Sequence, residues 1–190
     1  MRWLGFDLGE KRTGVAISNP EGTFAVPLTV LEHDESGPSP EQIDALLGEH
    51  EVQGIVAGLP LSLSGSPSQH THRTVRIAQA IALHLGVTLQ LPADMAGEYP
   101  DIGTEESGRG TDTTQPSLRM MLWDERLSTW EAQQLLPPSR KRKQNGKGKT
   151  KRLDAHAAAI ILQSYLDSLH SNDAPLPDLP NLPDDDVTQP

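Results

Sequence analysis

Apolar residues in the first third of the chain fall into short runs of the length that predicts β-strands. Three such runs cover residues 2–8, 13–18 and 23–31, and a turn sequence at residues 19–22 joins the second run to the third. A short turn between successive strands makes a hairpin, so the three runs predict an antiparallel meander. Pro27 removes one ladder donor from the third run, which favours a place for that strand at the edge of the sheet.

The remaining apolar positions alternate between helical and extended spacing. We expect helices over residues 41–50 and 66–85 and from Ser128 and Asp154 onward, strands over residues 52–59 and 119–123, and an extended segment over residues 87–91. Ser66 is the expected N-cap of the second helix, and Gly86 is expected to end it. A meander followed by two right-handed crossovers predicts an α/β fold, in which helices flank a mixed five-stranded sheet.

Two acidic segments depart from this pattern. Residues 93–117 hold six acids, one base and no apolar periodicity, and residues 171–190 hold five prolines, five aspartates and no base. Such compositions do not bury enough apolar surface to offset the entropy of ordering. We therefore expect one domain over residues 1–170, interrupted by a surface insertion that is disordered or an extended loop and followed by a disordered tail.

The charge is strongly segregated along the chain. The formal net charge is −10, yet eight of the 16 basic residues lie in an expected basic loop at residues 139–152, which contains no acid. These eight are Arg140, Lys141, Arg142, Lys143, Lys147, Lys149, Lys151 and Arg152. Electrostatic attachment to the phosphates of a nucleic acid is the favoured interpretation of this loop, over a solvated flexible segment.

The cysteine count and the apolar stretches exclude further classes of protein. The chain has no cysteine, so it has neither disulfides nor thiolate metal sites. No apolar stretch approaches the ~20 residues needed to span a bilayer, and the first residues lack the apolar core of a signal peptide. We expect a soluble, cytoplasmic protein without a membrane partner.

Acidic residues occur at three places where the expected fold could form a functional site. Asp7 lies inside an apolar strand, where an unpaired carboxylate is costly, so function is favoured over a carboxylate satisfied by backbone donors. Asp124 and Glu125 end a parallel strand, and spacing alone does not say which of them faces a site. Asp154 opens the expected last helix, where an acid also complements the helix dipole.

Converging carboxylates suit phosphodiester hydrolysis. Two hard cations ~4 Å apart can activate water and stabilise the leaving oxygen, and Mg²⁺ prefers carboxylate ligands. The loop from Gly58 to Ser66 leads into a helix N-terminus, which is either a phosphate cradle or a plain connection with its own cap. His70, His72 and His156 are expected to be ordinary surface histidines.

Four segments together resemble the YqgF/RuvX family, whose members are named pre-16S rRNA nucleases and, earlier, Holliday junction resolvases. The segments are GFDLGEKRTGVAIS at residues 5–18, IVAGLPLSLSGS at 55–66, DERLSTWEA at 124–132 and KGKTKRLDAHAAAIILQSYL at 147–166. No single segment is decisive, but their order and spacing make the match specific. The insertion, the acidic tail, Trp130 and His156 depart from the usual family pattern.

The resemblance implies an RNase H-like fold and a metal-dependent endonuclease that matures the 5′ end of precursor 16S rRNA. It implies that Asp7, Glu125 and Asp154 are both the catalytic residues and the ligands of Mg²⁺ or Mn²⁺, and so favours Glu125 over Asp124. It also assigns Arg126 and the basic residues to the substrate, here Lys147, Lys149, Lys151 and Arg152. Gly58 and Ser66, at the two ends of the possible phosphate cradle, are the other candidate substrate contacts.

Three other functions compete with this interpretation. A resolvase of branched DNA would need two active sites in a dimer, and the sequence leaves a monomer or a homodimer open. A non-catalytic RNA-binding factor in ribosome assembly would not need all three acids. Actin-like and sugar-kinase ATPases also begin with an Asp7-Leu8-Gly9 segment, but they need two such domains, for which 190 residues are too few.

Overall fold

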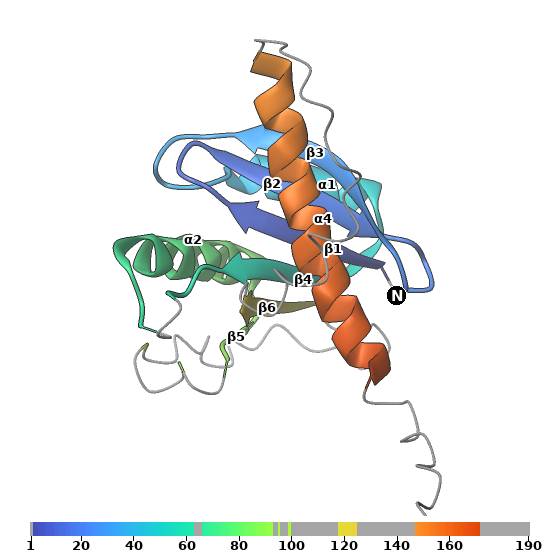
Figure 1. The fold of residues 1–190 in the computed structure, drawn as a ribbon. Coiled ribbons are helices and arrows are strands. Elements are labelled where there is room, and N and C mark those ends of the chain that lie inside the picture. The colour runs from blue at the N-terminus through green and yellow to red at the C-terminus, as the bar shows by residue number, and fades with distance from the viewer. Residues whose placement is uncertain are drawn as a thin grey trace, which may run out of the picture.

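The computed structural model describes residues 2–62, 66–92, 95, 99, 118–124 and 147–171 (Figure 1). The strands in these ranges are β1 (Arg2–Leu8), β2 (Arg12–Ser18), β3 (Ala25–Glu32), β4 (Val52–Leu59), β5 (Leu89–Gln90) and β6 (Arg119–Asp124). The helices are α1 (Pro40–Glu49), α2 (Gln69–Leu85) and α4 (Lys147–Ser171). Among the described residues, no helix is long and apolar enough to cross a membrane.

The strands form a mixed sheet in the order β3-β2-β1-β4-β6-β5. Strands β1, β2 and β3 make the expected antiparallel meander, and β4, β5 and β6 are parallel to their neighbours and to β1. This topology is that of an RNase H-like fold. The sheet has six strands in the described part of the chain rather than five, because residues 89–90 pair with Met120 and Met121 at its edge.

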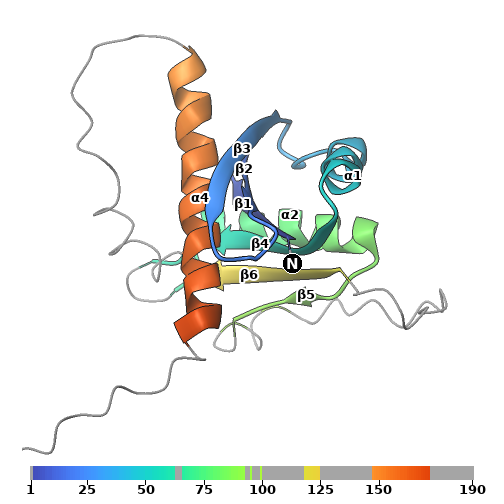
Figure 2. The same ribbon diagram turned by 90° about the vertical axis from the view of Figure 1, so that its right-hand side faces the viewer.

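Helices cover both faces of the sheet, with α4 on one side and α1 and α2 on the other (Figure 2). Because side chains alternate along a strand, β1 contributes Leu4 and Phe6 to the core beneath α1 and α2 and Trp3 to the core beneath α4. Asp7 falls on the same face as Trp3. The acid that the sequence singles out is therefore directed toward α4.

Two helix starts differ from the sequence expectation. The N-cap of α2 is Ser68 rather than Ser66, because the Ser68 hydroxyl accepts from the backbone N–H of Thr71 while the Thr71 hydroxyl accepts from the N–H of Ser68. Gly86, with φ 66°, ends this helix as expected. Helix α4 begins at Lys147, so residues 147–152 are helical rather than loop, and Asp154 does not lie in the first turn.

The beginning of the acidic insertion contacts the body of the domain. Met95 is only 2% exposed and belongs to the core beneath α1 and α2, and the ring of Tyr99 packs on His72. Two residues at the beginning of the insertion therefore contact the domain. The rest of the insertion, the helix expected from Ser128 and residues 172–190 lie outside the described residues.

Candidate active site

The crossing of α4 over the meander brings two distant acids together. Asp7 in β1 is the cross-strand partner of Gly14 in β2. Gly14 has no side chain, and the backbone of α4 passes so close above it that an added Cβ would overlap the carbonyl group of Asp154. A second close approach lies at Gly5, where an added Cβ would stand 2.7 Å from Leu162 Cβ. These glycines let the helix lie directly on the strands and set Asp154 beside Asp7.

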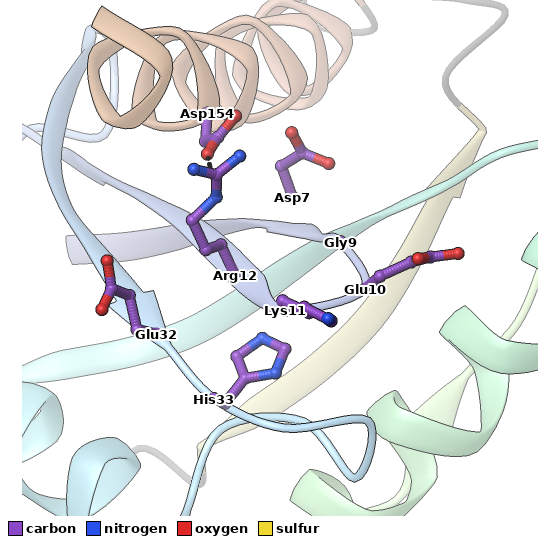
Figure 3. A pocket seen from close by; sticks show the side chains of 8 residues that line it. All are labelled: Asp7, Gly9, Glu10, Lys11, Arg12, Glu32, His33 and Asp154. Atoms are coloured by element: carbon purple, nitrogen blue, oxygen red, sulfur yellow. Dashed lines mark ion pairs between the residues drawn. The ribbon is translucent and has the colours of Figure 1, made fainter. Parts of the chain in front are cut away.

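Both acids line an open pocket with a volume of about 580 Å³ (Figure 3). Its lining residues are Asp7, Gly9, Glu10, Lys11, Arg12, Glu32, His33 and Asp154. Figure 3 shows Asp7 and Asp154 close together beneath α4, with the guanidinium of Arg12 next to Asp154. The pocket therefore combines carboxylates with basic side chains from the turn after β1 (Lys11) and from the start of β2 (Arg12).

The ionised form of Asp7 is energetically disfavoured in this pocket. Burial is the main cause that raises the pKa of its carboxyl group, and the negative charge of Asp154 raises it further. The charge of His70 acts in the opposite direction and lowers it. A cation bound between the two acids would relieve both of the effects that raise this pKa.

Asp154 has unused capacity to accept a ligand. Its Oδ2 lies 3.0 Å from Nε of Arg12, which makes an ion pair. The alignment is not that of a hydrogen bond, and this buried oxygen accepts none from the described residues. A buried carboxylate oxygen without a hydrogen bond is unfavourable, and a metal ion would satisfy it.

Two carboxylates and one unsatisfied oxygen fit a hard divalent cation such as Mg²⁺. Among the described residues, no group of three or more His, Asp or Glu side chains could hold a metal by itself. Asp7 and Asp154 would thus supply part of a ligand set, and the predicted third acid, Glu125, lies outside the described residues together with Arg126.

Asp124 does not share this face of the sheet. Its partner in β4 is Leu59, which belongs to the core beneath α1 and α2. Met120 and Leu122, at alternating positions of β6, belong to the same core. Of the two neighbouring acids, Asp124 is therefore directed away from Asp7 and Asp154.

The predicted substrate contacts have different surroundings. Gly58 is buried in β4 opposite Trp123, and the register of β1 and β4 sets it next to Asp7 on the face toward α4. Ser66 is exposed and precedes the N-cap of α2 by two residues, and its carbonyl oxygen accepts from Ser62. Lys147, Lys149, Lys151 and Arg152 belong to the first turns of α4.

Sequence reasoning missed the basic side of the pocket. Lys11 and Arg12 come only three and four residues after the end of the Asp7 strand, and this Lys-Arg pair was the available signal. His33 comes from the end of β3, and its Nε2 lies 2.8 Å from the hydroxyl of Thr13. Its Nδ1 lies 2.6 Å from the carbonyl oxygen of Asp34 and must donate, because a carbonyl only accepts. No sequence signal points to His33, since only the tertiary fold brings it here.

The raised pKa of Asp7 predicts a pH dependence of stability. Between the ordinary aspartate value of 3.8 and the raised value, the folded protein binds more protons than the unfolded chain. The free energy of unfolding therefore falls as pH rises through this window. In metal-free buffer, Asp7→Asn should remove this part of the slope and gain stability relative to wild type as pH rises. Urea denaturation at a series of pH values tests this, and parallel profiles would contradict it.

Comparison with known proteins agrees with the family resemblance. The family model described as RuvX, Holliday junction resolvase, matches residues 1–99 and 109–168. The omitted residues 100–108 lie inside the acidic insertion, and the match ends before the acidic tail. The RuvC protein of T. thermophilus, solved in complex with a Holliday junction substrate, has a TM-score of 0.42 and 11% identity over 90% of this chain and 96% of that chain. This likeness is too distant to bear on the site.

Relatives with higher sequence identity span almost the same length. A protein of Anaeromyxobacter sp. (strain Fw109-5) is 34% identical over 173 residues, which are 90% of this chain and 100% of the relative. A protein of Thermoanaerobacter pseudethanolicus is 31% identical over 169 residues, 88% of this chain and 97% of the relative. Each carries the name "putative pre-16S rRNA nuclease". The strand order, the paired acids of the pocket and these matches lead to one conclusion: the chain belongs to the RuvX family.

Proposed function

We propose that this protein is a metal-dependent endonuclease that hydrolyses phosphodiester bonds, with precursor 16S rRNA as its substrate and maturation of the 5′ end as its role. The observation that carries the proposal is the meeting of Asp7 and Asp154 in one open pocket. The names of the relatives supply the substrate.

Asp7 and Asp154, with Glu125 as third ligand, would hold Mg²⁺ or Mn²⁺. A bound divalent cation supplies Lewis acidity for the phosphate and activates water as a nucleophile. Arg12 orients the Asp154 carboxylate through the ion pair of 3.0 Å. Lys11, at the rim of the same pocket, offers an ammonium group to the incoming phosphate.

The basic residues at the start of α4 give an acidic protein a place to attach RNA. Residues 147–152 lead directly into Asp154 on the same helix. At 1.5 Å per residue, Lys147 lies about 10 Å along the helix axis from Asp154. Four positive charges within that distance favour a path in which the RNA strand runs along α4 into the pocket.

A direct comparison of substrates tests the function. The full-length protein is incubated with Mg²⁺ or Mn²⁺ and either a precursor 16S rRNA fragment or a four-way DNA junction. We expect a cut in the RNA near the mature 5′ end and no symmetrical cleavage of the junction. Preferred cleavage of the junction by a dimer would favour the resolvase activity that the family description names. Binding of RNA without any cleavage would favour an assembly factor.

Metal binding should stabilise the wild-type protein through the two acids. A ligand that binds only the folded state at about 100 times its dissociation constant adds about 2.7 kcal/mol to the free energy of unfolding. We expect Mg²⁺ or Mn²⁺ to raise the melting temperature of wild type, and excess EDTA to reverse the rise and stop cleavage. Asp7→Asn should show no such rise. An equal rise in the variant would mean that the ion binds elsewhere.

A further inference from the structure

The first turn of α2 is fixed beside the acid pocket by two contacts. The Thr71 hydroxyl donates to the carbonyl oxygen of Pro60, which follows β4. Arg73 donates through Nη2 to the carbonyl oxygen of Glu10 at 3.0 Å, and its Nη1 lies 3.3 Å from the Glu10 carboxylate. Glu10 itself lines the pocket. The helix start therefore holds a defined position relative to the carboxylates.

The side chains of two histidines project from this turn in different directions. His70 is exposed and close enough to Asp7 for its charge to act on that carboxylate. His72 is two residues further, about 200° around the helix, and so points away from the pocket. The first turn of α2 contains no acid, and the helix dipole makes its N-terminus attractive to anions. A nucleic acid strand could thus pass from Asp7 over this turn without meeting a negative charge from it.

His72 is one half of an aromatic pair. The Tyr99 hydroxyl lies 2.7 Å from Nδ1 of His72, and the ring centroids are 5.6 Å apart with a tilt of 55°. His72 is exposed and Tyr99 is half-buried, so the pair remains partly open to solvent. Met95, buried in the core, anchors the segment that carries Tyr99. Two flat rings are thereby held at a fixed angle on the far side of the α2 start.

We infer that His72 and Tyr99 form a stacking subsite for an unpaired base of the nucleic acid, close to the nucleotide that is cut at the acid pocket. His70, which projects from the same turn about 200° away from His72, would donate an N–H to a phosphate between the subsite and Asp7. Aromatic rings accept any base, because every base has a π-face. Stacking also suits a protein of net charge −10, since it adds affinity without relying on charge. This inference rests on the proposed function in so far as it takes RNA as the ligand.

A fluorescent base analogue tests the subsite. Full-length Asp7→Asn protein, which should leave RNA intact, is titrated with a single-stranded RNA that carries 2-aminopurine at successive positions. Stacking quenches this base, so we expect a several-fold loss of fluorescence at one or two adjacent positions. Adding His72→Ala should restore most of the fluorescence. His84→Ala, at the other end of the same helix, is the matched control and should quench like the parent.

Conservative variants separate stacking from a merely structural role. Tyr99→Phe keeps the ring but loses the hydroxyl, and it should retain most of the quenching, whereas Tyr99→Leu should lose it. If the pair only anchors the insertion, these variants would shift the melting temperature while every form of the protein left 2-aminopurine bright. Two results with the Asp7→Asn parent would overturn the inference. One is 2-aminopurine that stays bright when binding of the RNA is saturated, and the other is no binding of the RNA at all.

Cleavage by the wild-type protein distinguishes this failure from failure of the proposed function. Wild type that cuts the RNA but does not quench 2-aminopurine would refute the subsite alone. Wild type that quenches but never cuts would refute the nuclease alone and keep the subsite. For an active enzyme, an abasic nucleotide at the quenched position should weaken cleavage as much as His72→Ala does, and the two changes together should cost no more than either one.

Discussion

Replacing Asp7 by Asn is expected to lower the cleavage rate by about a thousandfold or more, while the protein folds at least as stably as wild type at neutral pH. The amide occupies the same volume but is a poor ligand for a hard cation. Burial and the nearby charge of Asp154 both penalise the carboxylate, so its removal relieves the folded state. Cleavage kinetics and thermal unfolding, measured on the same preparations without and with Mg²⁺, give both quantities.

The matched control is Asp124→Asn, which makes the same chemical change at the end of β6. Asp124 pairs with Leu59 and is directed to the opposite face of the sheet. We expect this variant to retain the wild-type rate within a few-fold. Equal losses in both variants would show that acidity in general matters and not the pocket. A fully active Asp7→Asn enzyme would remove the catalytic assignment altogether.

Local patterns in the sequence were enough to predict most of the sheet. Residues 2–8 and 52–59 are strands with the predicted bounds, because uninterrupted apolar runs of this length are typical of buried strands. Asp7 was singled out by the same pattern, because an unpaired charge inside a buried strand is energetically costly. Pro27 indeed lies in the edge strand β3.

Choices between similar local options were harder. Ser66 and Ser68 are both good N-caps, and the structure selects Ser68 because Thr71 completes the reciprocal pair of hydrogen bonds. Residues 147–152 carry enough helix-forming Lys and Arg side chains to extend α4, although positive charge at a helix N-terminus is unfavourable. Strand β5 has two residues, too few to show any periodicity.

The surroundings of the acids depend on contacts between distant segments. The ion pair of Arg12 with Asp154, the effect of the His70 charge on the pKa of Asp7 and the packing of Tyr99 on His72 each join distant segments of the chain. A single sequence contains no local pattern for such contacts. What it did contain, unrecognised, was Gly14, whose lack of a side chain decides how closely α4 can lie on β2.

Gly14→Ala should therefore damage both stability and activity. Its Cβ would overlap backbone atoms of Asp154, which cannot rotate away as a side chain tip could, so α4 must move outward from the sheet. We expect the free energy of unfolding to fall by about 3 kcal/mol, at the upper end of what overpacking usually costs. Displacement of Asp154 from Asp7 by about 1 Å should lower the cleavage rate about a hundredfold. Urea denaturation and cleavage at a temperature where the variant is fully folded measure the two effects separately.

Gly48→Ala is the matched control, since its Cβ would meet nothing within 4 Å and it lies in helix α1. Alanine at such a position should raise the free energy of unfolding by up to about 1 kcal/mol and leave cleavage unchanged. The decisive quantity is the activity of folded Gly14→Ala. If the variant loses stability but cleaves like wild type once folded, the contact at Gly14 supports only the fold. If activity falls in the folded state and metal no longer raises the melting temperature, then close packing of α4 on β2 is what creates the metal site.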